Sequence, residues 1–178
     1  MAPGPKGSNA APPLAACSVN FPPPGHNHQP CVSATLARAR SAFETCGLKL
    51  TGLRLCVLGE IAASHRAIGA YEIIDGLAAK GTRLAPVSVY RALQALTAAG
   101  MVHRFESRNA YFACHGGHDG SRQPVVLACL DCGTIAEIDA TDAFSAIDAI
   151  ARRHDFTVTV RIAEVAGRCA GCTGRKSP

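Results

Sequence analysis

The spacing of apolar residues predicts an α-helical N-terminal half for this chain. Apolar side chains recur at intervals of three and four residues in four segments, which is the period of a helix with one buried face. The expected helices cover residues 33–46, with Ser33 as the N-cap, and then about 52–61, 70–80 and 86–99. Cys46 and Cys56 fall on apolar faces of the first two helices, so we expect both in the core.

The period changes to two after Gly100. Residues 101–106 and 110–114 alternate as two strands around a polar turn, which is the pattern of a β-hairpin. The helix before this hairpin has an apolar stripe on one side and a polar side that carries Arg91. Three helices, a fourth helix with a polar face and a hairpin predict a winged helix.

The C-terminal part predicts a small α+β domain. Strands are expected at residues 125–129 and 134–138, a helix at 141–154, and a long strand at 156–166. The long strand is predicted from the alternation of Phe156, Val158, Val160 and Ile162, which is typical of a sheet with one buried face. Residues 1–32 hold most of the prolines and are expected to form a tail without a helix or central strand.

Composition and charge narrow the function further. The chain is 48% hydrophobic, but its longest apolar runs are far shorter than the roughly 18 residues that span a bilayer, which excludes a transmembrane protein. Residues 33–112 carry ten basic and five acidic residues. This local excess favours an anionic partner such as nucleic acid for the first domain.

Nine cysteines in 178 residues require an explanation. The N-terminus lacks the basic start and apolar stretch of an export signal, so we expect a reducing cytoplasm, where paired thiols are metal ligands more often than disulfides. Two Cys-x-x-Cys pairs can supply four thiolates to one closed, structural zinc site, whereas a redox pair needs a single motif. The pairs are Cys129 with Cys132 and Cys169 with Cys172.

A second set of ligand-type residues is more scattered along the chain. Histidine, thiolate and carboxylate together suit zinc better than a harder cation, although each residue alone could be an ordinary surface or core residue. The set comprises His103, Cys114, His115, His118 and Glu137. A further group in the tail also has zinc-binding atoms, at the entropic cost of ordering a flexible segment; it comprises Cys17, His26, His28 and Cys31.

Several of these motifs together resemble the ferric uptake regulator (Fur) family, most of all its zinc uptake regulator (Zur) branch. The resemblance covers about residues 33–173 and is carried by Ala70-Tyr71-Glu72, by the stretches 87–93 and 100–107, by Cys114 and Glu137, and by both Cys-x-x-Cys pairs. It implies a homodimeric, zinc-responsive repressor that binds double-stranded operator DNA, with no small-molecule substrate other than the metal ion.

The resemblance also implies an organisation and a role for each metal site. It gives a tail at 1–32, a winged-helix DNA-binding domain at 33–114, a hinge loop at 115–124, a dimerisation and metal-binding domain at 125–173 and a short tail at 174–178. The four-cysteine zinc is then structural. A second, regulatory zinc at the hinge is held by His103, Cys114 and Glu137, with His118 as the fourth ligand and His115 as its alternative.

For DNA, the resemblance places the fourth helix in the major groove. Tyr90 and Arg91 then face base edges, Ser88 a phosphate, and Arg104 and Arg108 on the hairpin track the backbone.

Three other interpretations compete with this one. Within the same family, an iron-responsive or peroxide-responsive regulator is the main alternative. A zinc-knuckle interaction module would leave Arg91 and the basic first domain without a role. A zinc deaminase would need a His-x-Glu motif and a proline before Cys129, and the sequence has neither.

Overall fold

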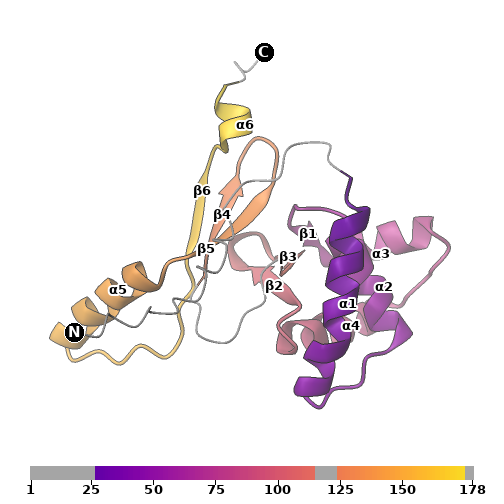
Figure 1. The fold of residues 1–178 in the computed structure, drawn as a ribbon, viewed down its shortest axis with the longest axis horizontal. Coiled ribbons are helices and arrows are strands. Elements are labelled where there is room, and N and C mark those ends of the chain that lie inside the picture. Colours follow the sequence, from indigo (N-terminus) through magenta and orange to yellow (C-terminus); the bar gives the residue numbers. More distant parts are fainter. Residues whose placement is uncertain (1–26, 115–123, 175–178) are drawn as a thin grey trace, which may run out of the picture.

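The computed structural model describes residues 27–114 and 124–174, and these form two groups of elements (Figure 1). The first group contains four helices and a small sheet in the strand order β1-β3-β2. The second contains a sheet in the order β5-β4-β6 and two further helices. None of the described helices is both long and apolar enough to cross a membrane. The fold is therefore α+β, as the sequence predicts.

The four N-terminal helices form the main hydrophobic core. They are α1 (Gln29–Thr45), α2 (Gly52–Ala62), α3 (Ala70–Ala79) and α4 (Pro86–Ala98). The core residues recur at helical spacing on each helix, for example Ala39 and Phe43 on α1 and Val89, Leu93 and Leu96 on α4. The apolar periodicity thus identified all four helices.

The predicted start of α1 is wrong by five residues. The helix begins at Gln29 rather than after Ser33, with Pro30 in its first turn and His28 as N-cap. A proline is tolerated there because the first-turn N–H groups have no partner within the helix. The density of prolines upstream therefore did not prevent helix formation at the end of the expected tail.

The hairpin after α4 forms the wing. β2 (Val102–Phe105) and β3 (Ala110–Ala113) pair antiparallel, with His103 opposite Phe112, and the short helix η1 (Glu106–Arg108) joins them. β1 (Ile68–Gly69) pairs with the other edge of β3. The predicted winged helix is confirmed.

The second group is built around β4. β4 (Pro124–Cys129) pairs antiparallel with β5 (Ile135–Asp139) and parallel with β6 (Glu164–Gly167). Helix α5 (Thr141–Arg153) projects away from this sheet, while α6 (Ala170–Thr173) lies at its opposite end (Figure 1).

The predicted long strand over residues 156–166 is wrong. Only Glu164–Gly167 is a strand, and residues 155–163 lead to it without regular structure. Three of the four alternating apolar side chains are exposed rather than buried: Phe156 is 64%, Val160 73% and Ile162 65% accessible, while Val158 is half-buried. Within one chain β4 offers a partner only from Glu164 onwards, so the alternation has no sheet to join.

The expectation that Cys46 and Cys56 lie in the core is also wrong, because both are exposed. A cysteine beside an apolar stripe can sit at the edge of the buried face, and helical period alone does not separate the edge from the centre of a stripe.

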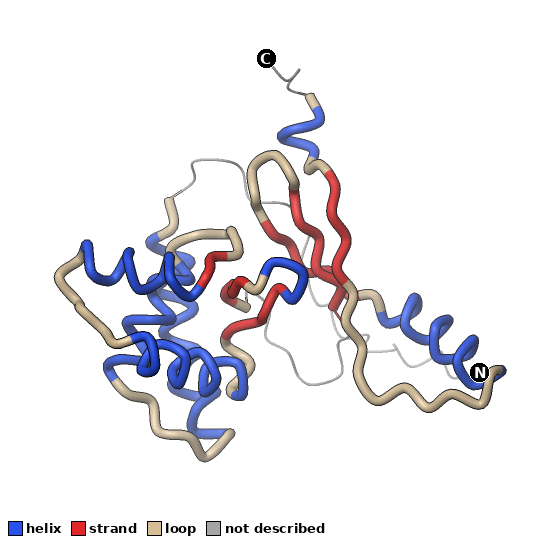
Figure 2. Tube along the Cα trace, turned by 180° about the vertical axis from the view of Figure 1, so that it is seen from behind, coloured by secondary structure: helices blue, strands red, loops and turns tan. Residues whose placement is uncertain are grey.

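The wing packs directly on the second sheet, as the view from behind shows (Figure 2). Phe105 and Phe112 of the wing form a small buried cluster with Ala128 and Ile135 of β4 and β5. The carboxylate of Glu164 on β6 also accepts backbone hydrogen bonds from Glu106 and Ser107 at the wing turn. One apolar contact and one polar contact therefore hold the wing against the sheet.

A second junction lies beside the wing, in the loop between α2 and β1. The carbonyl of His65 accepts a 2.8 Å hydrogen bond from the backbone N–H of Ile135. Arg66 forms an isolated antiparallel bridge with Thr134. This loop therefore belongs to the helical group in sequence but also contacts the edge strand of the second sheet.

Substitution of Gly100 tests whether the left-handed backbone after α4 requires glycine. Its φ is +66°, and an added Cβ would meet nothing within 4 Å, so Gly100→Ala should cost only the left-handed backbone penalty of about 1–2 kcal/mol in unfolding free energy. Gly59→Ala in the interior of α2, also without a close neighbour, should instead raise stability by about 0.5–1 kcal/mol. Denaturant unfolding measures both, and equal stabilities for the two variants would contradict this account.

Candidate metal centres and DNA interface

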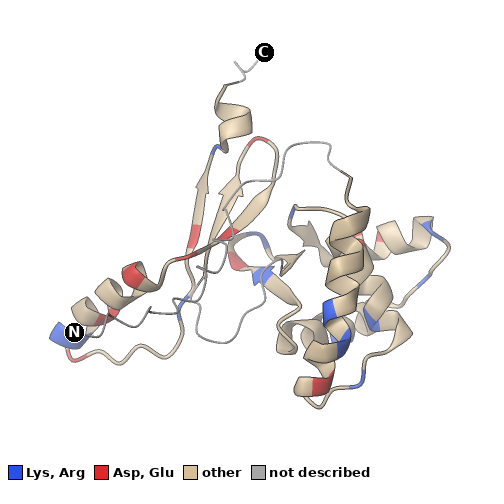
Figure 3. Cartoon of the chain, in the orientation of Figure 1, with Lys and Arg blue, Asp and Glu red and all other residues tan. Residues whose placement is uncertain are grey.

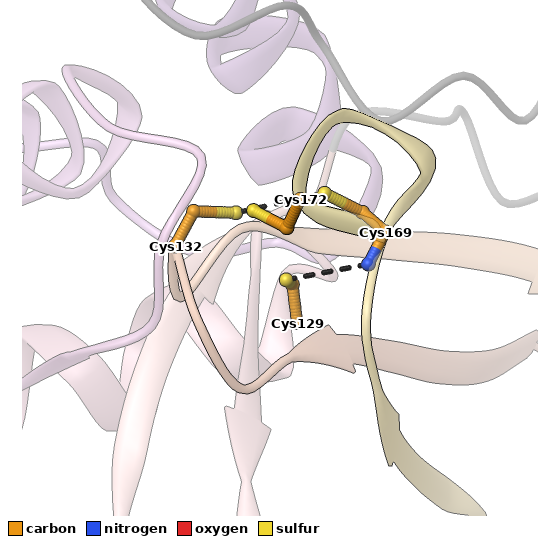
Figure 4. Close-up of side chains that lie close together, drawn as sticks. All are labelled: Cys129, Cys132, Cys169 and Cys172. Carbon is orange, nitrogen blue, oxygen red and sulfur yellow. Dashed lines mark hydrogen bonds between the residues drawn. The ribbon is translucent and has the colours of Figure 1, made fainter. Parts of the chain in front are cut away.

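The four cysteines of the two Cys-x-x-Cys pairs meet at one end of the β5-β4-β6 sheet (Figure 4). Cys129 ends β4, Cys132 lies in the turn to β5, Cys169 is the N-cap of α6 and Cys172 lies within α6. We call these four residues the cysteine cluster. Their sulfur atoms all lie within 4.8 Å of one another.

The sulfur positions fit a tetrahedral zinc ion. Two thiolates bound to the same zinc at about 2.3 Å stand about 3.8 Å apart, and Sγ of Cys132 lies 3.8 Å from Sγ of Cys169. Three of the four residues are buried and Cys132 is half-buried. With four protein ligands no coordination position is open, which is the arrangement of a structural rather than a catalytic site.

A backbone hydrogen bond and a side-chain ion pair hold the two Cys-x-x-Cys pairs in place. The N–H of Cys169 donates to Sγ of Cys129 at 3.3 Å, and Arg168 pairs with Asp131 at 2.8 Å across the two turns. Gly133 closes the first turn with φ +73°, and the Arg66 side chain fills the place where a Cβ would stand. The turn therefore requires glycine on both conformational and steric grounds.

The four thiols differ in acidity. Burial opposes ionisation of Cys129, but backbone hydrogen bonds from Cys132, Cys169 and Asp131 outweigh it and lower the pKa of Cys129 to about 6. Cys172, by contrast, interacts with the Cys169 side chain and is desolvated, which raises its pKa to about 12. Burial also raises the pKa of Cys169. The metal-free cluster thus keeps protons near neutral pH that a bound metal ion must displace.

A second group of ligand atoms lies where the wing meets the sheet. His103 is on β2, Cys114 directly follows β3 and Glu137 is on β5; we call these three residues the hinge cluster. Their ligand atoms all lie within 4.8 Å of one another. Nε2 of His103 is 3.3 Å from Oε1 of Glu137, and nitrogen and oxygen ligands of one tetrahedral zinc ion also stand about 3.3 Å apart.

The surroundings of the hinge cluster fix its members. The guanidinium of Arg38 on α1 donates a hydrogen bond to the carbonyl oxygen of Cys114 at 2.5 Å. The His103 ring packs on Phe112 with 5.6 Å between ring centroids. His118 and His115, the two expected candidates for a fourth ligand, lie outside the described residues.

The expected DNA-contacting residues of α4 lie on its outer side. Arg91 is exposed, Tyr90 is 38% accessible and Ser88 is half-buried. Val87 beside them is also exposed, so this side of α4 offers both polar and apolar contacts, as base edges and thymine methyl groups require.

The two wing arginines are exposed but differ in their contacts. Arg104 donates to the side-chain oxygen of Asn109 at 2.9 Å and pairs with Glu106 at 3.3 Å. Arg108 stacks over the Phe105 ring at 5.8 Å. Figure 3 marks the Lys and Arg residues of the helical group and of the wing in blue.

Two positioning residues were missed at the sequence level. Arg38 holds the Cys114 carbonyl from 76 positions away, and Glu164 accepts hydrogen bonds from Glu106 and Ser107 at 58 and 57 positions away. Neither has a local motif. A partner at that separation is visible only in the folded chain.

A winged helix with an exposed basic side, joined to a sheet that carries two sets of metal-ligating side chains, defines a transcription regulator rather than an enzyme. The sequence model of the ferric uptake regulator family matches residues 45–163. This chain belongs to that family.

Individual relatives agree in sequence and in structure. The zinc uptake regulation protein of Escherichia coli (strain K12) is 31% identical over 137 residues, which cover 77% of this chain and 80% of that protein. A zinc uptake regulator solved with zinc and DNA superposes with a TM-score of 0.72 at 30% identity, covering 80% of this chain and 95% of the other. The crystal structure of holo XcZur gives 0.71 at 35% identity, covering 81% and 99%.

The acidity of the cysteine cluster leads to a pH test. Because the pKa values of Cys169 and Cys172 are raised, both are protonated at neutral pH. Zinc binding should therefore release at least two protons, and the apparent zinc affinity should fall at least about 100-fold per pH unit between about pH 8 and 7. Competition with a chromophoric chelator measures this slope. Cys46→Ser should keep the slope, since Cys46 is exposed and outside the cluster. An affinity that does not change with pH would refute the proton displacement.

Proposed function

We propose that this chain is a zinc-responsive transcriptional repressor that binds operator DNA as a homodimer and represses zinc-uptake genes. The observation that carries the proposal is the hinge cluster, which takes His103 and Cys114 from the wing and Glu137 from the sheet. The similarity to zinc uptake regulators, including one solved with zinc and DNA, supports the same function. The cytoplasm, where the DNA is found, is the proposed location.

The ligand types favour zinc over the alternative of an iron or peroxide sensor. The hinge cluster includes the thiolate of Cys114, which is buried. A thiolate with an imidazole and a carboxylate is a set that suits zinc, whereas harder cations prefer oxygen ligands. His118 is the proposed fourth ligand, with His115 as the alternative. In the cysteine cluster, Cys129, Cys132, Cys169 and Cys172 are proposed to hold a second, structural zinc.

The proposed switch depends on the relative position of two domains, residues 33–114 for DNA binding and 125–173 for dimerisation and metal binding, with 115–124 as the hinge. A zinc ion bound at the hinge supplies one shared coordination centre for ligands from both. His103, Cys114 and Glu137 then hold the wing and the sheet in one orientation. If DNA prefers that orientation, each ligand tightens binding of the other by the same factor, typically about 5–150-fold.

Dimerisation would cover the apolar side chains that one chain leaves exposed. Ile147 and Ile150 on α5 are about half accessible, and Phe156, Val160 and Ile162 are more so. A second copy of the chain is the proposed partner, because family members act as dimers. A two-fold dimer presents two copies of α4 to two half-sites on one face of the duplex.

The proposed DNA contacts divide between specificity and positioning. Arg91 and Tyr90 would contact base edges, because they are exposed on α4. Ser88, Arg104 and Arg108 would contact phosphates. The Asn109 and Phe105 contacts of the two wing arginines limit their rotamers before DNA binds, which lowers the entropic cost of the contacts.

Cys114→Ser tests the switch. The variant should remain a folded dimer with its cysteine cluster filled, but zinc should no longer increase operator affinity by the expected factor of about 5–150. Fluorescence anisotropy with labelled promoter DNA at buffered free zinc measures the effect, with ferrous and manganous ions in parallel. Cys56→Ser, an exposed cysteine outside both clusters, is the matched control. A Cys114→Ser protein that still responds to zinc would remove that residue from the switch, and stimulation by ferrous but not zinc ions would favour the iron sensor.

Arg91→Ala tests the DNA contact. Loss of a bidentate base contact should weaken specific binding by about 1–3 kcal/mol, while zinc uptake stays unchanged. Arg91→Lys retains the charge but not the planar fork, so it should keep non-specific affinity and lose most discrimination. A gel-shift titration against operator and scrambled DNA separates these effects, and unchanged discrimination in both variants would exclude Arg91 from base recognition.

A further inference from the structure

A third group of ligand-type side chains gathers at the start of α1, away from both clusters described above. It comprises His28, which is the N-cap of α1, Cys31 in the first turn of that helix, and His65 in the loop after α2; we call it the N-terminal cluster. Cys17 and His26, the other members of the group expected in the tail, lie outside the described residues. We propose that the N-terminal cluster is a third metal site, which binds zinc or a similar soft to borderline divalent ion.

The distance between Cys31 and His65 fits shared coordination of one ion. Sγ of Cys31 lies 3.8 Å from Nε2 of His65. A sulfur ligand at about 2.3 Å and a nitrogen ligand at about 2.0–2.1 Å on one tetrahedral zinc ion stand about 3.6 Å apart. The ring of His28 lies beside that of His65, with 5.0 Å between centroids and 42° between planes, so a second imidazole stands next to the Cys31–His65 pair.

The backbone explains why these residues meet. His28 and Cys31 are three positions apart at the N-terminus of α1, so their side chains lie on the same face of the helix. That face is turned towards the loop that contains His65, 34 positions later than Cys31. All three residues are half-buried. The cluster is therefore partly desolvated, yet open to an incoming ion.

The ligand types restrict the metal. Two imidazoles and one thiolate suit zinc, copper or nickel, whereas magnesium, calcium and manganese favour oxygen ligands. Three protein ligands leave one coordination position for water or an exchangeable group. The site should therefore bind zinc more weakly than the four thiolates of the cysteine cluster, and it should empty before that cluster as free zinc falls.

Metal binding here would act on the second junction between the two groups of elements. The carbonyl of His65 accepts the N–H of Ile135 on β5, and Arg66 bridges Thr134. An ion shared by Cys31 and His65 would tie the start of α1 to that junction. This is a different position from the hinge cluster, whose members come from the wing and β5.

Metal stoichiometry of the full-length protein tests the proposal. Zinc is titrated into metal-free protein, and cobalt is used in parallel because a cobalt–thiolate bond gives a charge-transfer absorption band. The double variant Cys31→Ser/His65→Ala should bind about one equivalent less of either metal than the unsubstituted protein. Cys46→Ser/His154→Ala, which changes one exposed cysteine and one exposed histidine outside the clusters, should bind the full amount.

Two further variants separate ligation from folding and from the proposed switch. Cys31→His replaces one zinc ligand by another. This variant should therefore bind as much zinc as the unsubstituted protein, but it should lack the cobalt–thiolate band that belongs to this site. Cys114→Ser should lose a different equivalent, together with zinc-stimulated operator binding. Unchanged stoichiometry in Cys31→Ser/His65→Ala, with the metal-free variant as thermally stable as its parent, would overturn the third site and leave the proposed repressor function intact.

Discussion

The contact between the wing and the β5-β4-β6 sheet is the interaction on which the rest of the structure depends. Phe105 and Phe112 bury their rings against Ala128 and Ile135, and the cluster is small. At about 25 cal/mol per Å² of apolar surface, a few side chains can hold two domains together without making their relative position permanent. This balance is what a coordination site needs if it is to change the relative position of two domains.

The hinge cluster lies directly beside that contact. His103 pairs across the wing with Phe112 in the β2–β3 ladder, and Glu137 pairs with Val126 in the adjoining sheet. The ligands are thus placed by the same strands that carry the apolar contact. Ligand geometry and domain packing are therefore two aspects of one arrangement, so a change in either must alter the other.

The elements could be predicted from the sequence where their signals are local. Apolar period identified α1–α4 and the wing, and the spacing of Cys129, Cys132, Cys169 and Cys172 was enough to identify the cysteine cluster. The sequence-based predictions failed where the structure of a segment depends on residues far from it in the sequence. The start of α1 depends on a tolerated proline, and the exposed alternation from Phe156 has no partner strand among the described residues. His65 becomes a candidate ligand only because the start of α1 lies beside it in the folded chain.

β6 connects two sites that otherwise have little in common. Glu164 at its first residue caps the wing turn, and five positions later Cys169 joins the cysteine cluster. Successive side chains of a strand point to opposite faces, so inserting or deleting one residue between these positions would turn one of the two away from its partner. The length of the segment from Glu164 to Cys169, which continues two residues beyond the end of this strand, is therefore as constrained as the identity of those two residues.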